Sequence, residues 1–377
     1  MTFSVATEHG DALESATDQD AEREARLVAW FRDSRSTLIG FSGGVDSAYL
    51  ACVALDALGP SGVLAVIGRS ASYPAEQWER ARAVAERFGV PVLEVATDEL
   101  NDQRYSSNPT NRCYFCKTEL WDVLLPIAVE RGFDVVVDGT NADDLTDHRP
   151  GGRAASEHGV RSPLAELGFS KAAIRRLSRS RGIPTWSQPS SPCLSSRIPY
   201  GTAVTVDRLN QIERAEAALR AIGVAGDMRV RYHGDLARVE VGPDVVGSWL
   251  GPGMRARVYH VVRSAGFDRV AVDARGFRSG SLNLLGGVAA EPLVRARSNA
   301  SGDAAGLANA LHKVGISCDV EARERLALLR CTAAADIDGL CVDTVRAAVV
   351  DTARGHGFTH VAIEVGTAVD DAAVHRG

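Results

Sequence analysis

The sequence has no run of about 18 consecutive apolar residues, the length that a membrane-spanning helix needs. It has no excess of positive charge either, because 42 Lys and Arg residues stand against 48 Asp and Glu residues, for a net charge of −6. That balance argues against a general nucleic-acid binder. The stretch Met1 to Glu24 is acidic and lacks the basic-then-apolar pattern of a signal peptide. We therefore expect a cytoplasmic protein without membrane or nucleic-acid partners.

Cysteine is sparse, with seven residues among 377. In a cytosolic chain, cysteines are more often free, metal-binding or catalytic than paired in disulfides. Cys52 lies in an apolar helical stretch, so we expect it in the core. Cys318, Cys331 and Cys341 lie in a C-terminal stretch where the sequence suggests no function for them.

Between Thr37 and Val137, short apolar runs alternate with amphipathic stretches. This alternation is typical of βαβ units and predicts an α/β fold with a parallel sheet buried on both faces. The predicted strands are 37–41, 62–67, 91–96 and 133–137, and the predicted helices are 48–58, 75–88 and 117–131.

Beyond about Val204 the pattern changes to a compact α+β unit that recurs. Ala218–Val224 resembles Ala310–Ile316, and Leu236–Arg238 resembles Leu328–Arg330, both at an offset of 92 residues. A near-constant offset predicts a duplicated module. We therefore predict a flexible leader (1–25), an α/β domain (26–203), an α+β domain (204–279), a linker (280–300) and a degenerate repeat (301–377).

A glycine-rich loop follows the first predicted strand. Ser42–Ser47 reads Ser-Gly-Gly-Val-Asp-Ser and leads into a helical pattern. Gly43 and Gly44 have no Cβ to keep a phosphate from the backbone, and the first N–H groups of the helix are available to an anion. Ser42 and Ser47 offer hydroxyl donors, and Asp46 suits a Mg²⁺ ion that accompanies phosphates. An ordinary strand–turn–helix is the alternative, and the Walker pattern is absent.

Other polar residues are predicted at the same edge of the sheet. Asp138 and Asn141 follow the fourth strand and are candidates for a nucleotide pocket, with simple loop capping as the alternative. The polar run 141–151 is either a functional loop or a solvated one. A basic helix is predicted at 171–181, whose arginines either meet phosphate or form a solvated face: Arg175, Arg176, Arg179 and Arg181.

Three cysteines form a candidate constellation. Cys113 and Cys116 lie three residues apart near a predicted helix start, and Cys193 lies in an irregular Ser- and Pro-rich stretch where Arg197 could lower its pKa. One interpretation is an iron–sulfur or other metal site formed by all three. A redox or structural pair, or zinc with His148 or His158 as a weak fourth ligand, is the second. The third is that the cysteines are unrelated.

Two arginines mark a candidate anion site in the α+β unit. Arg229 and Arg231 are two apart on a predicted strand, so both point to one face, and Glu240 on the next strand can orient them. An ion-paired sheet face is the alternative. At an offset of 92 the second copy has Glu321 and Arg323, so we do not expect it to bind the same ligand.

Taken together, these motifs resemble the LarE family of ATP-dependent sulfur transferases, within the N-type ATP pyrophosphatases. The resemblance covers about Arg26 to Asn283 and includes the following stretches: Ser42–Ser47, Arg112–Lys117, Asp138–Asp144, His148–Gly151, Pro192–Arg197 and Arg229–His233.

The resemblance implies that ATP adenylates a carboxylate of pyridinium-3,5-biscarboxylic acid mononucleotide and that sulfur then displaces AMP, in biosynthesis of a nickel-pincer cofactor. The sulfur would come from Cys193, which becomes dehydroalanine, or from a [4Fe–4S] cluster on Cys113, Cys116 and Cys193. Because this chain has all three cysteines, it resembles the members of the family that use a cluster. The implied cofactors are ATP and Mg²⁺, and the implied assembly is a homo-oligomer. By the same matching, ATP binds at Ser42, Gly43, Gly44, Asp46, Ser47, Asp138 and Asn141, and the substrate phosphate binds at Arg229, Arg231 and Glu240.

Three other interpretations compete with this one. A tRNA thiolase would share the glycine loop and the use of three cysteines. It would also be expected to have a basic surface and a second cysteine pair. An amidotransferase-fed ATP pyrophosphatase would not need the three cysteines. A non-catalytic nucleotide-binding regulatory module would bind ATP without releasing pyrophosphate.

Overall fold

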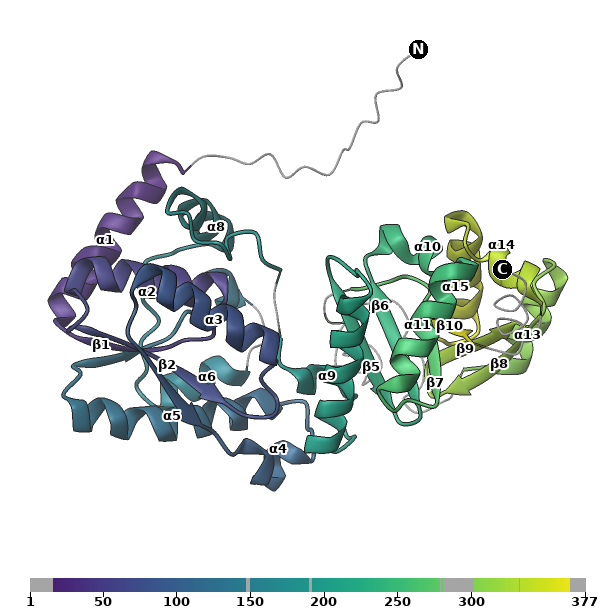
Figure 1. Ribbon diagram of the computed structural model, residues 1–377, viewed down its shortest axis with the longest axis horizontal. Helices are drawn as coiled ribbons and strands as arrows, with labels where there is room; N and C mark the ends of the chain where they lie inside the picture. Colours follow the sequence, from purple (N-terminus) through teal and green to yellow (C-terminus); the bar gives the residue numbers. More distant parts are fainter. Residues whose placement is uncertain are drawn as a thin grey trace, which may run out of the picture. The chain divides into compact units, whose positions relative to one another are not determined.

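The computed structural model describes residues 16–146, 150–189, 192–278, 280, 302–331 and 333–366 (Figure 1). The chain divides into two compact units, each described separately below. The first comprises Met1–Ser106 and Asn111–Cys193, and the second comprises Ser107–Thr110 and Leu194–Gly377.

The first unit is built on a four-stranded sheet in the order β3-β2-β1-β4, in which every pairing is parallel. Its strands are β1 (Thr37–Gly40), β2 (Val63–Arg69), β3 (Val92–Ala96) and β4 (Val135–Val137). Its longer helices are α1 (Asp18–Ser34), α2 (Val45–Leu58), α3 (Ala75–Phe88), α5 (Arg112–Arg131), α6 (Pro150–Glu157) and α8 (Lys171–Ser180). Its shorter helices are η1 (Glu99–Asn101), α4 (Gln103–Ser106), η2 (Asp143–Thr146) and α7 (Pro163–Glu166).

Helices cover both faces of this sheet (Figure 1). One core cluster joins the sheet to α1, α2, α3 and α8, with Ile39, Leu50 and Ile174 fully buried. A second cluster joins the opposite face to α5 and α6 around Trp121. The strands are buried on both sides, which explains their continuous apolar runs. The predicted α/β class with a parallel sheet is confirmed.

The order of the strands determines where a ligand can bind. β1 lies between β2 and β4, so the chain reverses its direction of travel across the sheet at β1. Ligands of open parallel sheets bind outside the carboxyl ends of the strands at such a switch point. The loops after β1 and β4, which contain Ser42–Ser47 and Asp138–Asn141, therefore meet.

The structure has an N-terminal helix that the sequence analysis did not predict. α1 begins at Asp18, inside the predicted leader 1–25, and Thr17 forms a capping box with Asp20. Asp20 is buried and pairs with Arg176 of α8 at 2.8 Å. The leader prediction is therefore wrong for residues 18–25, because these polar residues gain partners far along the chain.

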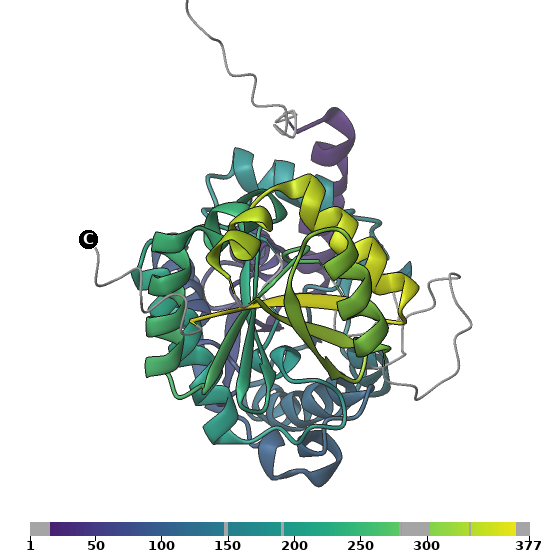
Figure 2. The same ribbon diagram turned by 90° about the vertical axis from the view of Figure 1, so that its right-hand side faces the viewer.

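The second unit contains one six-stranded sheet in the order β5-β6-β7-β10-β9-β8 (Figure 2). Its strands are β5 (Met228–His233), β6 (Leu236–Val241), β7 (Arg269–Asp273), β8 (Cys318–Arg323), β9 (Leu326–Cys331) and β10 (His360–Val365). Its longer helices are α9 (Val206–Ala221), α11 (Pro252–Ser264), α13 (Ala304–Lys313) and α15 (Asp343–Gly355). Its shorter helices are η3 (Leu194–Arg197), η4 (Pro243–Val245), α10 (Val246–Leu250) and α14 (Ala334–Gly339).

The two copies of the duplicated module follow the same order of elements. Helix, strand, strand, short helix, helix and strand run from α9 to β7 in the first copy and from α13 to β10 in the second. The copies join through the antiparallel pair β7–β10, so the sheet is continuous. The predicted separation into a domain at 204–279 and a repeat at 301–377 therefore differs from the structure, which forms one unit from both.

The structure also corrects the alignment of the copies. Leu236 begins β6 and Leu326 begins β9, so Leu236 corresponds to Leu326 and not to Leu328. The predicted offset of 92 holds for the helix ends at Ala221 and Lys313 and fails at the strands. The cause is the loop between helix and strand, which is shorter in the second copy.

Opposite faces of this sheet have different chemistry because successive strand residues alternate. Val230 and Val239, paired across β5 and β6, are buried and apolar, and α9, α11, α13 and α15 contact the strands. The other face of the same pair contains Arg231 opposite Arg238. This second face is called the charged face below.

One cross-strand pair is a disulfide. Cys318 and Cys331 lie directly opposite each other on β8 and β9 and are bonded, with their Cα atoms 4.1 Å apart. The expectation of non-disulfide cysteines is therefore wrong for this pair. Cys52 is buried in the core as expected, and burial raises the pKa of its thiol to about 12.

Candidate active site

The glycine loop between β1 and α2 is held from several sides. Ser47 Oγ accepts from the Ser42 N–H at 3.2 Å and donates to the Gly44 carbonyl at 3.3 Å. The Ser42 carbonyl accepts from Tyr73 Oη at 2.9 Å and from Gln77 Nε2 at 3.2 Å. Within the loop, these bonds fix the backbone that would surround a phosphate.

The two glycines of this loop have different requirements. Gly43 has a φ of 68°, and a Cβ there would lie 2.4 Å from the Cβ of Ala81. Gly44 is the N-cap of α2, and a Cβ added there would contact only Ser42 Oγ, at 3.5 Å. No side chain caps α2, so its N-terminal N–H groups are arranged for an anion.

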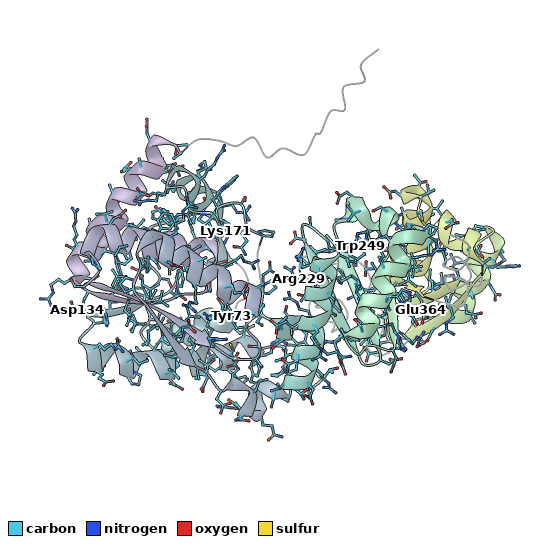
Figure 3. The ribbon with its side chains drawn as sticks, in the orientation of Figure 1. Tyr73, Asp134, Lys171, Arg229, Trp249 and Glu364 are labelled. Atoms are coloured by element: carbon cyan, nitrogen blue, oxygen red, sulfur yellow. A yellow bond between two sulfur atoms is a disulfide. The ribbon has the colours of Figure 1, made fainter. Side chains whose placement is uncertain are left out.

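Asp46 lies in the first turn of α2 beside a lysine that the sequence analysis did not single out. Lys171 Nζ, from the first residue of α8, forms an ion pair with Asp46, and Asn141 Nδ2 lies 3.5 Å from Asp46 Oδ1. Burial raises the pKa of Asp46, and the nearby ammonium of Lys171 opposes that rise. Figure 3 labels Lys171 and Tyr73 among the side chains of this unit.

The turn after β4 packs directly against the glycine loop. A Cβ on Gly139 would lie 2.9 Å from the backbone nitrogen of Ser47. Asp138 accepts hydrogen bonds from Thr140 N at 3.1 Å, Thr140 Oγ1 at 2.8 Å and Ser162 Oγ at 2.7 Å. In this arrangement Asp138 shapes the turn, while Asn141, buried to 2% exposure, reaches Asp46.

The arginines of the basic helix α8 have structural partners. Arg176 pairs with Asp20, and Arg181 pairs with Glu24 at 2.8 Å and Asp56 at 2.6 Å. Arg179 lies over the ring of Trp186 at 5.2 Å, and Arg175 donates to the Gln188 carbonyl at 3.2 Å. These four arginines are therefore engaged by partners within the first unit and do not form the solvated face given as the alternative. Lys171 of the same helix contacts Asp46 beside the glycine loop.

The three cysteines come together in the first unit. Cys113 and Cys116 lie one turn apart at the start of α5, and Cys193 is half-buried. Loss of surrounding water, followed by the nearby Cys193 thiol, raises the pKa of Cys113. Burial raises the pKa of Cys116 as well, with contributions from Glu99 and Cys193. These mutual effects place the three sulfurs in one neighbourhood.

A buried carboxylate adjoins this neighbourhood. Glu99 is 2% exposed, and its Oε1 accepts hydrogen bonds from Ser70 Oγ at 2.5 Å and Ser72 Oγ at 2.7 Å. Sequence reasoning missed Glu99, although Ser70 follows β2 at the sheet edge where ligands were expected. The sequence signal for Glu99 would have been its place as an acidic residue just after β3, at the same edge of the sheet.

The loop before α6 falls partly outside the described residues. Asp147, His148 and Arg149, and with His148 one predicted zinc ligand, lie outside the described residues. Gly151 lies against α5, because a Cβ there would be 3.0 Å from Lys117 Cγ and 3.5 Å from the Cys113 carbonyl. His158 contacts Asp122 at 3.2 Å and the Ala154 carbonyl at 2.7 Å.

The sequence resemblance implies Mg²⁺ and an iron–sulfur cluster, which take different donor atoms. In the part of the chain that the structure describes, no group of three or more His, Cys, Asp or Glu residues is arranged to hold a metal ion. Cys113, Cys116 and Cys193 are thiols, the donors that an iron–sulfur cluster takes, and a cluster on them stays a prediction. Asp46 offers the oxygen donor that Mg²⁺ prefers, and Mg²⁺ commonly takes most of its other ligands from phosphate and water.

The second unit contains the predicted arginine pair on its charged face. Arg231 pairs with Glu240 at 2.7 Å and donates to the Ser196 carbonyl at 3.0 Å. Arg229 lies over the ring of Phe277 at 5.0 Å, and burial, together with the nearby Arg197, lowers its pKa to about 10. Arg229 is also labelled in Figure 3.

Arg197 is paired with a carboxylate of the second unit. It binds Glu216 through two hydrogen bonds, of 3.0 Å and 3.1 Å, and Glu216 also accepts from the Val230 N–H at 3.0 Å. The pair fixes η3 against β5. Three buried arginines thus gather near two carboxylates, an arrangement suited to a multiply charged oxyanion.

Comparison with known proteins shows the family of this chain. The chain is 37% identical over 263 residues to the pyridinium-3,5-bisthiocarboxylic acid mononucleotide synthase of Lactiplantibacillus plantarum, covering 70% of this chain and 94% of that protein. It is 43% identical over 259 residues to an uncharacterized protein of Synechocystis sp., covering 69% of this chain and 96% of that protein. The chain belongs to the LarE family.

Two further similarities were found. The NAD synthase family model matches residues 30–111, which include the glycine loop. NMN synthetase from Francisella tularensis is similar in structure, with a TM-score of 0.40 and 18% identity over 46% of this chain and 75% of that chain. LarE membership confirms the predicted family and, with it, an ATP-dependent adenylating enzyme. Among the described residues, no helix is long and apolar enough to cross a membrane.

Proposed function

We propose that this LarE-family chain converts a carboxylate of pyridinium-3,5-biscarboxylic acid mononucleotide into a thiocarboxylate, using ATP. The observation that carries the proposal is the gathering of three cysteines in the same unit as the glycine loop. The name of the Lactiplantibacillus plantarum relative, a synthase of the bisthiocarboxylic acid mononucleotide, supports the substrate and product. The localisation we propose is the cytoplasm.

The first half of the reaction is adenylation. A carboxylate oxygen attacks the α-phosphorus of ATP, and pyrophosphate leaves. The loop N–H groups after Ser42, together with Gly43 and Gly44, would hold the pyrophosphate, and Ser47 would fix the loop. Mg²⁺ would supply charge neutralisation when bound, with Asp46 as its protein ligand. Asn141 and Lys171 orient Asp46.

The second half is sulfur transfer. The Cys193 thiolate attacks the carbonyl carbon of the acyl adenylate, and AMP leaves with the bonding electrons. A base then removes the Cα proton of Cys193. The Cβ–S bond breaks with its electron pair on sulfur, which leaves a thiocarboxylate and dehydroalanine.

Cys113 and Cys116 remain thiols in this scheme. Burial raises the pKa of both thiols, which makes each a weaker nucleophile at neutral pH than an exposed thiol. A [4Fe–4S] cluster on the three cysteines would supply sulfide if one were present. No step above passes through such a cluster, because no group of three or more His, Cys, Asp or Glu among the described residues is arranged to hold a metal ion.

The charged face of the second unit would hold the substrate's phosphate. Arg229 and Arg231 provide guanidinium groups, and Glu240 orients Arg231 through its 2.8 Å hydrogen bond. Arg197, held by Glu216, adds a third guanidinium. Substitution of Arg231 should therefore raise the KM for the nucleotide more than it lowers kcat.

The proposal is tested by incubating the anaerobically purified chain with ATP and the nucleotide and analysing both protein and product. We expect pyrophosphate, AMP, a thiocarboxylate product and dehydroalanine at position 193. Cys193→Ser should release pyrophosphate without forming the thiocarboxylate, while Cys113→Ala should still form it. Iron and acid-labile sulfide that disappear in Cys113→Ala, together with loss of product, would instead assign sulfur delivery to a cluster.

A further inference from the structure

A buried cluster of charge lies where strands from both copies meet on the charged face. Arg238 comes from β6, Asp273 from β7, Arg278 from the stretch after β7, and His360 from β10 of the second copy. Arg238 and Asp273 are fully buried, and His360 is 1% exposed. These four residues are called the inner cluster. Figure 3 shows the side chains of this unit and labels Glu364 of β10.

Several donors of the inner cluster are not used by the described residues. Arg238 Nη1 contacts Glu240 at 3.0 Å and pairs with Asp273, whereas its Nη2 is buried and has no hydrogen-bond partner there. The same holds for His360 Nε2 and for Nε and Nη2 of Arg278. Buried donors left without partners cost about 1–3 kcal/mol each, so native proteins fill such places with water or a ligand.

The cluster has more positive than negative charge. Arg231, Arg238 and Arg278 face the carboxylates of Glu240 and Asp273 within one connected network. Burial lowers the pKa of His360, with Arg238 and Arg278 adding to the effect, so its imidazole is neutral and provides hydrogen bonding without charge. A small anion would both balance the excess guanidinium and use the open donors.

We propose that Arg238, Arg278 and His360 bind a small oxyanion, a phosphate or carboxylate group, at a subsite that requires the second copy. The planar guanidinium groups match the oxygen geometry of such groups. His360 serves as a third donor when the Thr359 hydroxyl donates to its Nδ1, 3.0 Å away, and not to the Arg325 carbonyl, 3.3 Å away. The subsite does not depend on the sulfur chemistry proposed above.

The second copy is needed because it brings His360 to the cluster. Its counterpart at the start of β7 in the first copy is Arg269, which pairs instead with Glu321 and Glu364 at 2.8 Å. The subsite adjoins the Arg231–Glu240 pair, since Glu240 contacts Arg238 as well. Its ligand is therefore either free phosphate or the phosphate group of a bound nucleotide.

Inorganic phosphate is the probe that tests this subsite, titrated calorimetrically into the full chain. A saturating non-hydrolysable ATP analogue occupies the glycine loop during the titration. We expect His360→Leu and Arg278→Gln each to weaken phosphate binding by about tenfold or more, which is about 1.4 kcal/mol. Arg354→Gln removes one charge from an exposed position on α15 and should leave phosphate binding unchanged. Arg278 is partly exposed, so its substitution keeps the test valid if His360→Leu fails to fold.

A pyridine mononucleotide then distinguishes the two sources of phosphate. If it displaces inorganic phosphate and itself binds more weakly to Arg278→Gln, the subsite takes the nucleotide's phosphate. If it binds without displacing inorganic phosphate, the subsite takes the free ion. The proposal is overturned if Arg278→Gln and His360→Leu bind phosphate as tightly as the unsubstituted chain does. It is also overturned if the unsubstituted chain binds no phosphate, because water would then be the partner of the buried donors.

Discussion

At the scale of single residues, alanine substitutions at Gly43 and Gly44 should have different effects, the first on stability and the second on ATP binding. Gly43→Ala should destabilise the first unit by more than the usual 1–2 kcal/mol of a left-handed residue, because its Cβ would overlap Ala81. Gly44→Ala meets only Ser42 Oγ at 3.5 Å, so it should fold normally and lose ATP affinity. Thermal unfolding and ATP titration of the two variants measure this. Equal effects of both substitutions on both quantities would contradict the loop geometry.

Lys171 offers a test through pH. Burial raises the pKa of Asp46 and Lys171 opposes the rise, so Lys171→Met should raise it further. A carboxylate with a raised pKa is ionised only at higher pH, and the ionised form is the one that binds Mg²⁺. The acid limb of kcat/KM for pyrophosphate release should therefore move to higher pH.

Lys313→Met is the matched control, because Lys313 is an exposed lysine at the end of α13. It removes one positive charge without touching Asp46, and its pH profile should equal that of the unsubstituted chain. An unshifted acid limb in Lys171→Met would remove Asp46 from its assigned role.

At the scale of elements, α1 is attached to α8 by ion pairs. Burial raises the pKa of Asp20, but hydrogen bonds from Arg176 and Thr17 outweigh this, and the net pKa is lowered. Asp20→Asn should cost about 1–3 kcal/mol at neutral pH without changing ATP affinity. A lowered pKa gives stability that is present above the ordinary carboxyl pKa and lost as pH falls through the folded value.

The difference between Asp20→Asn and the unsubstituted chain should therefore shrink in acid. Asp18→Asn, at an exposed position in the same first turn, is the control and should change little. Chemical unfolding at several pH values measures both variants. A constant difference across the acid range would contradict the assigned ion pair.

The disulfide makes the β8–β9 hairpin sensitive to redox conditions. Cys318 and Cys331 close a short loop between adjacent strands, and their bond should contribute about 2–4 kcal/mol to the stability of the second unit. Adding a reductant should lower the unfolding midpoint of the unsubstituted chain. It should have no effect on a chain with both Cys318→Ala and Cys331→Ala. An unfolding midpoint that does not change with reductant in either chain would contradict the presence of the disulfide.

At the scale of the whole molecule, the second copy completes a sheet. β10 covers the edge of β7, where Val270 and Val272 are buried. A chain ending after Arg278 should expose that edge and self-associate more than the full chain does. Sedimentation velocity compares the two, and identical sedimentation and unfolding of both chains would contradict this view of the repeat.

Much of the first unit was predictable because its signals are local. Apolar runs and glycine turns lie next to each other in sequence, so the parallel sheet and the glycine loop follow directly. The Asp46–Lys171 and Asp20–Arg176 pairs join residues far apart in sequence and leave no local pattern. The same holds for the β7–β10 pairing, which merged two predicted domains into one unit.

The placement of the predicted site residues shows the same limit. Cys113 and Cys116 were predicted at a helix start, and α5 places them on one helical turn. Asp138 was predicted to bind nucleotide, yet its carboxylate is engaged by Thr140 and Ser162, a contact that residue type alone does not reveal. Its role in ATP binding, like that of the other site residues, stays a prediction.

The central claim is that this chain uses ATP to replace a carboxylate oxygen of a pyridinium nucleotide with sulfur. The most direct measurement is a single-turnover reaction with isotopically labelled nucleotide, followed by mass spectrometry of the nucleotide and of pyrophosphate release. The account predicts that one oxygen is exchanged for sulfur as pyrophosphate and AMP appear, and that Cys193→Ser stops the exchange while pyrophosphate is still released. ATP binding without any release of pyrophosphate, or exchange that survives Cys193→Ser, would contradict it.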